Sequence, residues 1–303
     1  MIDVHHLKMR YGNVDVLKDV HFSVKRGEVL ALLGPNGAGK TTTIEILEGF
    51  RIPSEGEVNV LGIEPKNGDE TWRAQLGIVM QSWRDHPKWR VRELLVHLSR
   101  YYEPYSTSTR PRPMDADELI AKVRLQAQAN QKVSSLSGGQ RRRLDVAIGL
   151  IGNPEILFLD EPTTGFDPQA RREFHDVIRR LADLEDTTIL LTTHDLHEAE
   201  KLSDRIIILA KGKIVANGSA AELAAQVAGT AEVRWKIDDE SFREDVDDAA
   251  RFVQQLFAQH GDTVTDLEVH KSSLEDTYIK MVQQIEQNGE LTDTLADFKE
   301  GIK

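Results

Sequence analysis

The chain reads Glu28-Val29-Leu30-Ala31-Leu32-Leu33-Gly34-Pro35-Asn36-Gly37-Ala38-Gly39-Lys40-Thr41-Thr42 at the point that decides its fold. A short apolar run, typical of a buried strand, stops at Gly34. Apolar residues at helical spacing follow the loop, and we expect this helix to end at Gly49. Strand, glycine loop and helix in this order are the setting in which the pattern G-x-x-x-x-G-K-[ST] forms a phosphate-binding loop. The sequence therefore predicts an α/β core that binds a nucleotide.

The glycine loop offers three kinds of contact to a phosphate group. Its glycines let the backbone N–H groups point inward, and the following helix adds its positive end. Lys40 supplies a point charge for the outer phosphates, and the Thr41 hydroxyl is suited to Mg²⁺. The expected nucleotide contacts are therefore Gly34, Pro35, Asn36, Gly37, Ala38, Gly39, Lys40, Thr41 and Thr42.

The composition is that of an ordinary globular protein with an acidic balance. The 303 residues allow roughly two domains, and the formal charge of −12 disfavours a nucleic-acid partner. The chain contains no cysteine, which excludes disulfides, thiolate metal sites and cysteine nucleophiles. No apolar run approaches the roughly 18 to 20 residues that cross a bilayer. If the protein moves a cargo across a membrane, we expect the pore to belong to another polypeptide.

Two α/β stretches flank a helical one. The predicted strands cover residues 20–24, 28–33, 77–80, 156–159 and 188–192. The predicted helices between and after them cover residues 91–102, 115–125, 140–151 and 168–181. The short apolar strands favour a mainly parallel sheet covered on both faces. Residues 82–152 then form a helical subdomain inserted into the α/β core.

A smaller pattern begins near residue 230. It predicts a strand over 231–237, a helix over 246–260, a strand over 264–269 and a helix over 273–285. We interpret this pattern as an accessory α/β lobe, and the last residues as a polar tail. The predicted division of the chain is 1–226, 230–287 and 288–303.

Two acids, Asp160 and Glu161, follow an apolar strand at its carboxyl end, where open parallel sheets bind their ligands. Asp160 is suited to holding Mg²⁺. Glu161 is suited to polarising the water that attacks a γ-phosphate. For an isolated pair of acids, the opening of a polar turn is an equal alternative.

A second helix start with anion-binding character lies at Leu136-Ser137-Gly138-Gly139-Gln140. Together with the phosphate loop, it resembles the nucleotide-binding subunit of an ABC transporter. The resemblance covers residues 2–220 and includes Pro162-Thr163-Thr164-Gly165-Phe166-Asp167, where Phe166 replaces a more usual leucine. It implies a P-loop ATPase core with an N-terminal antiparallel β portion.

The resemblance also implies roles for residues whose positions in the sequence alone do not indicate a function. It implies that His194, at the end of the strand over 188–192, donates to the γ-phosphate, and that Gln81 ligates Mg²⁺ or the attacking water. It implies that Tyr11 stacks on adenine and that Asp167 contacts the nucleotide. Without the family, a structural histidine, an exposed glutamine and a packed aromatic are the default interpretations.

Members of this family pair head-to-tail, so that the Lys40 loop of one chain and the Ser137 segment of the other clamp one ATP. The resemblance therefore implies ATP, Mg²⁺, a homodimer, and a separate transmembrane permease that holds the dimer peripherally at the cytoplasmic face of the membrane. In the family, the region that contains Trp83, Arg84, Trp89, Arg90 and Arg92 leads into the surface that receives a short helix of the membrane subunit, although tryptophan is most often a core residue. Residues 273–278 resemble exporters of drugs, antibiotics and lipid-like molecules.

A soluble ABC ATPase that acts on ribosomes or DNA is the alternative function. Such chains carry two nucleotide-binding domains or a long coiled coil between the motifs, and this sequence has neither. Arg141-Arg142-Arg143 is basic, but we expect it to form a solvated or interdomain face. A P-loop kinase or GTPase is a third possibility, but proteins of these classes lack a segment like residues 136–140.

Overall fold

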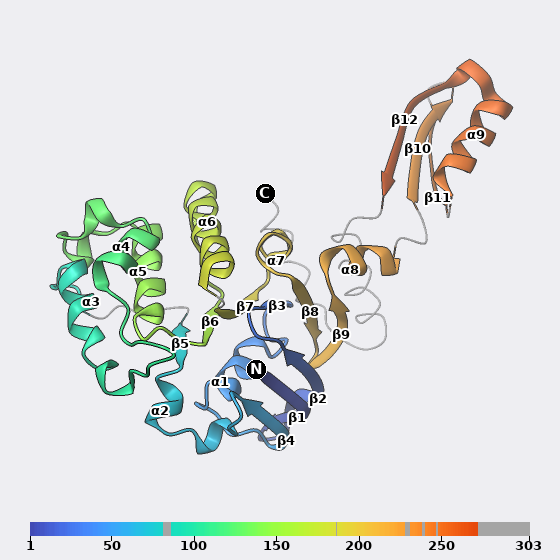
Figure 1. Ribbon diagram of the computed structural model, residues 1–303. Coiled ribbons are helices and arrows are strands. Elements are labelled where there is room, and N and C mark those ends of the chain that lie inside the picture. The colour runs from blue at the N-terminus through green and yellow to red at the C-terminus, as the bar shows by residue number, and fades with distance from the viewer. Residues whose placement is uncertain (81–85, 186, 228–230, 238–239, 247, 272–303) are drawn as a thin grey trace. The chain divides into compact units, whose positions relative to one another are not determined.

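A computed structural model of the chain describes residues 1–80, 86–185, 187–227, 231–237, 240–246 and 248–271 (Figure 1). The chain divides into two compact units, Met1–Val215 and Ala216–Lys303. Each unit is described by itself. Among the described residues, no helix combines the length and the apolar character needed to span a bilayer.

A six-stranded sheet forms the centre of the first unit, with the strand order β5-β6-β7-β3-β8-β9. Its strands are β3 (Val29–Leu33), β5 (Leu76–Val79), β6 (Ile156–Asp160), β7 (Thr188–Thr193), β8 (Arg205–Ala210) and β9 (Lys213–Gly218). The pairs from β5 through β8 are all parallel. Strands β3, β6 and β8 are mainly apolar, and β7 is buried along its whole length although half of its residues are threonine, as expected for a sheet covered on both faces. The predicted α/β class with a mainly parallel sheet is confirmed.

An antiparallel sheet with the order β2-β1-β4 forms the N-terminal β portion. Its strands are β1 (Ile2–Tyr11), β2 (Val14–Val24) and β4 (Glu55–Val60). Ile2 and Val4 on this sheet share one buried core with Ile44 of α1 (Lys40–Leu47) and with Leu30 and Phe158 of the parallel sheet. The antiparallel sheet and α1 therefore cover one face of the parallel sheet, and α6 and α7 lie on the other (Figure 1).

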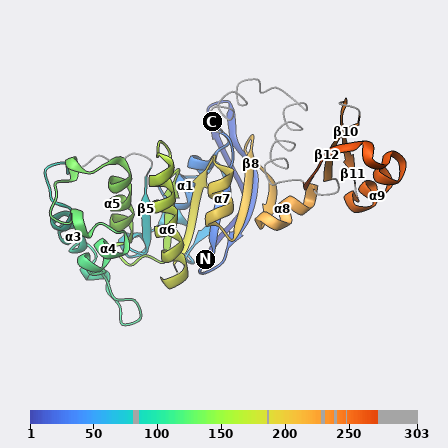
Figure 2. The ribbon, with the colours of Figure 1, turned by 90° about the horizontal axis from the view of Figure 1, so that it is seen from above.

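The remaining helices of the first unit are α2 (Glu70–Arg73), α3 (Val91–Ser99), α4 (Ala116–Lys122), α5 (Gly138–Leu150), α6 (Pro168–Glu185) and α7 (Leu196–Leu202). Short 3-10 helices cover Pro65–Asn67, Glu103–Tyr105, Gln126–Gln128 and Val133–Ser135. Helices α3, α4 and α5 pack together beside the edge strand β5 (Figure 2). They form the predicted helical subdomain. The helix predicted from residue 115 begins at 116 because Asp115 caps it, accepting the N–H groups of Asp117 and Glu118.

The second unit contains α8 (Ala220–Val227), β10 (Ala231–Ile237), β11 (Glu240–Val246), α9 (Ala249–His260), a 3-10 turn (Gly261–Thr263) and β12 (Val264–Lys271). Its sheet is antiparallel in the order β11-β10-β12. Val233, Trp235 and Leu256 lie in a small core between the sheet and α9.

The sequence prediction was wrong at β11. It assigned no element to residues 240–245 and placed the start of a helix at Val246, whereas this segment is a strand. Only Phe242 and Val246 are apolar in this segment, so alternation gives almost no signal. The strand is held instead by its backbone pairing with β10. The helix begins at Ala249, after Asp248 accepts the N–H of Arg251 as its cap. The helix predicted over 273–285 and the tail lie outside the described residues.

Candidate active site

The predicted phosphate loop connects β3 to α1. It contains Gly34, Pro35, Asn36, Gly37, Ala38 and Gly39, and α1 then opens with Lys40, Thr41 and Thr42. Gly39 has a φ of +107° as the residue that starts the helix, a conformation that other residues rarely adopt. The first N–H groups of an α-helix have no partner within the helix. The loop therefore directs the positive end of α1 to the edge of the sheet where β3 ends.

Lys40 is buried in the middle of this loop. Its Nζ donates to the carbonyl oxygens of Gly34 at 2.7 Å and Pro35 at 3.1 Å, and it lies 3.2 Å from Oε1 of Glu161. Burial lowers the pKa of Lys40, and the Glu161 carboxylate opposes that effect. The loop thus holds a cation beside a helix N-terminus, which is an arrangement suited to phosphate groups.

The acid pair and His194 meet at the same edge of the sheet. Strands β6 and β7 pair in parallel with Asp160 opposite Thr192, so the strand that carries Asp160 and the strand that His194 follows are neighbours. Directly beyond them, Nδ1 of His194 lies 3.4 Å from Oε2 of Glu161. The backbone N–H of Gly34 donates to the carbonyl of Thr193, which joins the start of the phosphate loop to the same place.

Two of the three residues predicted to hold Mg²⁺ lie side by side. Oγ1 of Thr41 is 3.3 Å from Oδ2 of Asp160, and Oδ1 of Asp160 accepts a hydrogen bond of 2.5 Å from the Thr192 hydroxyl. Mg²⁺ is bound by oxygen ligands, usually one or two carboxylates with waters and substrate phosphates. A hydroxyl and a carboxylate beside a phosphate loop fit this ion. Gln81 lies outside the described residues.

Glu161 is the most constrained residue of the site. Its φ is +42°, which is uncommon for a residue other than glycine, and its N–H donates to the Thr192 hydroxyl at 2.9 Å. Its carboxylate lies between His194 and Lys40, and it accepts a bond of 3.2 Å from the Thr164 hydroxyl. The interaction with His194, helped by Lys40, lowers the pKa of Glu161 to about 2 although burial opposes it, and Glu161 in turn raises the pKa of His194. Glu161 is therefore ionised at neutral pH, as a residue that polarises water must be.

The Ser137 segment opens α5 with a reciprocal cap. The Ser137 hydroxyl accepts the N–H of Gln140 at 3.3 Å, and the Gln140 side-chain oxygen accepts the N–H of Ser137 at 3.0 Å. Gly139 packs against Ala170 of α6, while Gly138 has open space around the position of a Cβ atom. Ser137 and Gln140 thus have a structural role within the chain, and both Ser137 and Gly138 are exposed at the start of α5.

Tyr11 and Asp167 lie in different settings. Tyr11 is 39% exposed at the end of β1, and the Arg51 guanidinium carbon lies 5.0 Å from the centroid of its ring. Oδ1 of Asp167 accepts the N–H groups of Gln169 and Ala170, so Asp167 caps α6.

In the segment predicted to contact a membrane partner, Trp89 makes ring contacts with two histidines. Trp83 and Arg84 are not among the described residues.

Arg142 is a residue of the site that the sequence did not single out. Its guanidinium is buried and donates to the carbonyl oxygens of Pro162 at 2.9 Å, Asp160 at 3.0 Å and Met80. The triple arginine was expected to form a solvated or interdomain face, but Arg142 is buried inside the unit Met1–Val215, where it connects α5 to the ends of β5 and β6. The helical spacing of Arg142 with the buried residues Val146 and Gly149 indicates that its side chain is buried, although not what it contacts.

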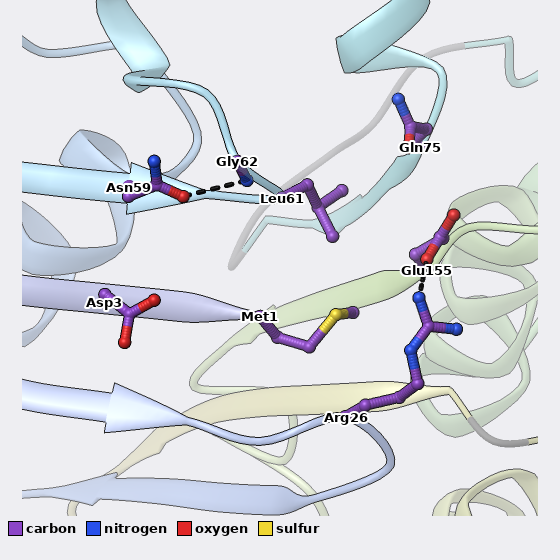
Figure 3. A pocket seen from close by; sticks show the side chains of 8 residues that line it. All are labelled: Met1, Asp3, Arg26, Asn59, Leu61, Gly62, Gln75 and Glu155. Carbon is purple, nitrogen blue, oxygen red and sulfur yellow. Dashed lines mark hydrogen bonds and ion pairs between the residues drawn. The ribbon is translucent and has the colours of Figure 1, made fainter.

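A separate hollow of about 470 Å³ lies at the opposite end of the parallel strands (Figure 3). Arg26, Gln75 and Glu155, which line it, precede β3, β5 and β6, whereas the predicted site residues follow these strands. Arg26 and Glu155 pair across it at 2.7 Å. It has no part in the site described above.

Comparisons with known proteins show the family to which the chain is similar. Residues 17–164 match the family described as ABC transporter. The Nod factor export ATP-binding protein I of Neorhizobium galegae is 39% identical over 228 residues, which are 75% of this chain and 65% of that protein. The protein of the same name from Burkholderia orbicola is 40% identical over 218 residues, 72% of this chain and 70% of that protein. This chain therefore spans about two thirds of the length of these relatives.

Solved structures share the fold. A dimeric ATP-binding cassette in a post-hydrolysis state, bound to ADP and Pi, matches 72% of this chain and 98% of its own, with 26% identity and a TM-score of 0.62. A structure described as the ATP binding subunit of an ABC transporter matches 93% of this chain and 99% of its own. Its TM-score is 0.66 and its identity 24%, so it indicates the fold alone.

Proposed function

The chain belongs to the ABC transporter family as an ATP-hydrolysing subunit, and from this premise we propose that it drives export through a separate transmembrane permease. One observation carries the chemical part of the proposal. The phosphate loop follows β3, Asp160 and Glu161 lie at the end of β6, and His194 follows β7. These strands are neighbours in the order β6-β7-β3, so the residues come together at the carboxyl ends of the strands. The relatives named above are export ATP-binding proteins, which supports the direction of transport.

In the proposed reaction, the phosphates of ATP bind at the loop, and Lys40 exchanges its bonds to loop carbonyls for bonds to phosphate oxygens. Glu161 orients and polarises the water that attacks the γ-phosphate. His194 donates a hydrogen bond to the same phosphate and is held towards it by Glu161. Mg²⁺, which Thr41 and Asp160 would hold together with Gln81, supplies charge that neutralises the phosphate oxygens.

We further propose a head-to-tail homodimer in which the Ser137 segment of one chain completes the site of the other. The open surroundings of Gly138 support this role, since the N-terminus of α5 is accessible there. The solved ATP-binding cassette named above is a dimer. The Tyr11 ring and Asp167 complete the proposed nucleotide contacts, with adenine stacked on Tyr11.

The proposed setting is the cytoplasmic face of the membrane, with no nucleic-acid partner. The proposed cargo class is drugs, antibiotics or lipid-like molecules, from the resemblance of residues 273–278. Residues 1–226 are the proposed nucleotide-binding domain, and the lobe over 230–287 and the tail over 288–303 are accessory to it.

The test is affinity purification of the full chain from detergent-solubilised native membranes, followed by an ATPase assay. We expect a polytopic membrane protein to co-purify, and Mg²⁺-dependent ATP hydrolysis that Lys40→Ala removes by weakening nucleotide binding. Co-purification with ribosomes or DNA, and not with a membrane protein, would overturn the transport assignment while leaving the ATPase assignment in place.

A further inference from the structure

Two histidines and an aspartate meet on the outer surface of the antiparallel sheet, on the adjacent strands β1 and β2. Nδ1 of His6 lies 2.9 Å from Oδ1 of Asp19, and Nε2 of His21 lies 3.0 Å from the same oxygen. The two imidazole rings meet edge to face with centroids 4.2 Å apart. One ligand-type atom from each residue lies within 4.8 Å of the other two, and all three residues are exposed.

The backbone departs from regular strand geometry where these side chains meet. The β1–β2 pairing shifts register between Val4 and Leu7, which is the signature of a β-bulge. His6 and Asp19 have φ values of +52° and +67°, which residues other than glycine adopt at some cost. On the neighbouring strand β4, a Cβ atom at Gly56 would lie 2.4 Å from the His6 carbonyl oxygen, so the bulge needs a glycine beside it. Bulges redirect side chains, and this one turns His6 towards Asp19 and His21.

We propose that His6, Asp19 and His21 form a binding site for a divalent transition-metal ion of the Zn²⁺ class, separate from the nucleotide site. Two imidazole nitrogens and one carboxylate oxygen are the ligand types that zinc accepts, with remaining positions open to water. With zinc–ligand bonds of about 2.0 Å, tetrahedral ligand atoms stand roughly 3.3 Å apart. The observed 2.9 and 3.0 Å need only a small outward adjustment of exposed side chains. Mg²⁺ prefers all-oxygen ligands and is not the ion expected here.

The protons must be rearranged for a metal to bind. The backbone N–H of His6 donates to Nδ1 of His21 at 3.2 Å, so the proton of a neutral His21 is on Nε2 and points to Asp19. A metal ion at Nε2 requires this proton to move to Nδ1, which then no longer accepts the His6 N–H, so the His21 ring must shift away from that N–H and leave it to water. His6 likewise gives up its Nδ1 proton and becomes the Nε2 tautomer. Because the cluster is exposed, water can take over the bonds that are lost.

The experiment measures metal binding by the full chain without nucleotide. Zn²⁺ is titrated calorimetrically, and Co²⁺ serves as a probe whose visible absorption reports nitrogen and oxygen ligation. We expect saturable binding of Zn²⁺ that His6→Gln, Asp19→Asn and His21→Gln each weaken. Loss of an outer-shell partner typically costs roughly 10- to 100-fold in metal affinity, so loss of a direct ligand should cost at least that.

His5→Gln is the matched control, since His5 is an exposed histidine on the same strand and outside the cluster. It should bind Zn²⁺ as the unchanged chain does. A second readout is thermal unfolding: Zn²⁺ should raise the unfolding temperature of the native chain and of His5→Gln, but not that of His21→Gln. Unchanged ATP binding shows that each variant is folded. The proposal is wrong if Zn²⁺ binding does not saturate, or if the three cluster variants bind Zn²⁺ as tightly as His5→Gln.

Discussion

The Nζ atom of Lys40 lies 3.2 Å from Oε1 of Glu161, so the phosphate loop and the acid pair are joined by a buried ion pair. The same ammonium is the group proposed to bind the outer phosphates of ATP. A γ-phosphate and the Glu161 carboxylate therefore compete for one cation. This competition gives Glu161 two separable effects, one on nucleotide binding and one on hydrolysis.

Glu161→Gln should separate these effects. The amide cannot accept a proton from water, so turnover should fall by about 10² to 10⁴. ATP affinity should be unchanged or higher, because the amide competes less well for Lys40. Steady-state ATPase rates and equilibrium ATP binding measure the two quantities. Glu118→Gln, which removes an exposed carboxylate from α4, is the control. A Glu161→Gln protein that hydrolyses ATP at the native rate would show that the assigned base is wrong.

The Glu161–His194 pair should make stability depend on pH with a defined sign. The pKa of Glu161 is lowered to about 2, so its contribution is present above pH 4.5, the ordinary value, and is lost towards pH 2. The pKa of His194 is raised, so its contribution is present below pH 6.5 and is lost as the pH rises through the raised value. The pair should stabilise most between these limits. The unfolding temperature of the native chain should exceed that of His194→Gln by more at pH 5.5 than at pH 8.5. An equal difference at both values would contradict the prediction.

Arg142→Leu should damage both stability and hydrolysis. It leaves the carbonyl oxygens of Met80, Asp160 and Pro162 without their shared donor, and an unsatisfied buried polar group costs about 1–3 kcal/mol. Asp160 carries the proposed metal ligand, so the remaining folded protein should hydrolyse ATP more slowly. Denaturant unfolding and kcat measure the two effects. Arg172→Leu, at an exposed position of α6, should change neither. If Arg142→Leu has the same stability and kcat as Arg172→Leu, the three hydrogen bonds contribute to neither stability nor hydrolysis.

The sequence predicted those strands, helices and site residues that depend on the chemistry of neighbouring residues in the chain. The strand before Gly34 and the helix after Gly39 follow from apolar spacing and glycine positions, and the strands that end at Asp160 and just before His194 follow from short apolar runs. It did not reach Arg142 as a link between three segments, because that role depends on contacts between residues far apart in the chain. It also missed β11, whose charged sequence is a strand only because β10 lies beside it.

A cross-link between two chains should test the head-to-tail dimer directly. Ala38 is buried, so the exposed Asn36 is the better position in the phosphate loop, and Gly138 has open space for a side chain. Because the native chain has no cysteine, Asn36→Cys and Gly138→Cys introduce the only thiols. In a Glu161→Gln background with ATP, cross-linked dimers should form between a chain with one thiol and a chain with the other. As a control, samples in which every chain carries Asn36→Cys, or every chain carries Gly138→Cys, are treated in the same way. The shared site is excluded if a doubly substituted chain links only within itself.

Removal of the residues after Gln226 should leave the nucleotide chemistry of each chain intact. The proposed nucleotide contacts, from Tyr11 to Asp167, and His194 all lie within the unit Met1–Val215. The lobe has its own small core around Val233, Trp235 and Leu256, and its loss removes no residue of the site. We therefore expect native ATP affinity in the truncated chain. Any loss should appear as a smaller dimer fraction or a lower unfolding temperature. ATP affinity and dimer fraction are compared for both chains under identical conditions, with circular dichroism to establish folding. A truncated chain that is folded and stable yet does not bind ATP would place part of the site in the lobe and overturn this division.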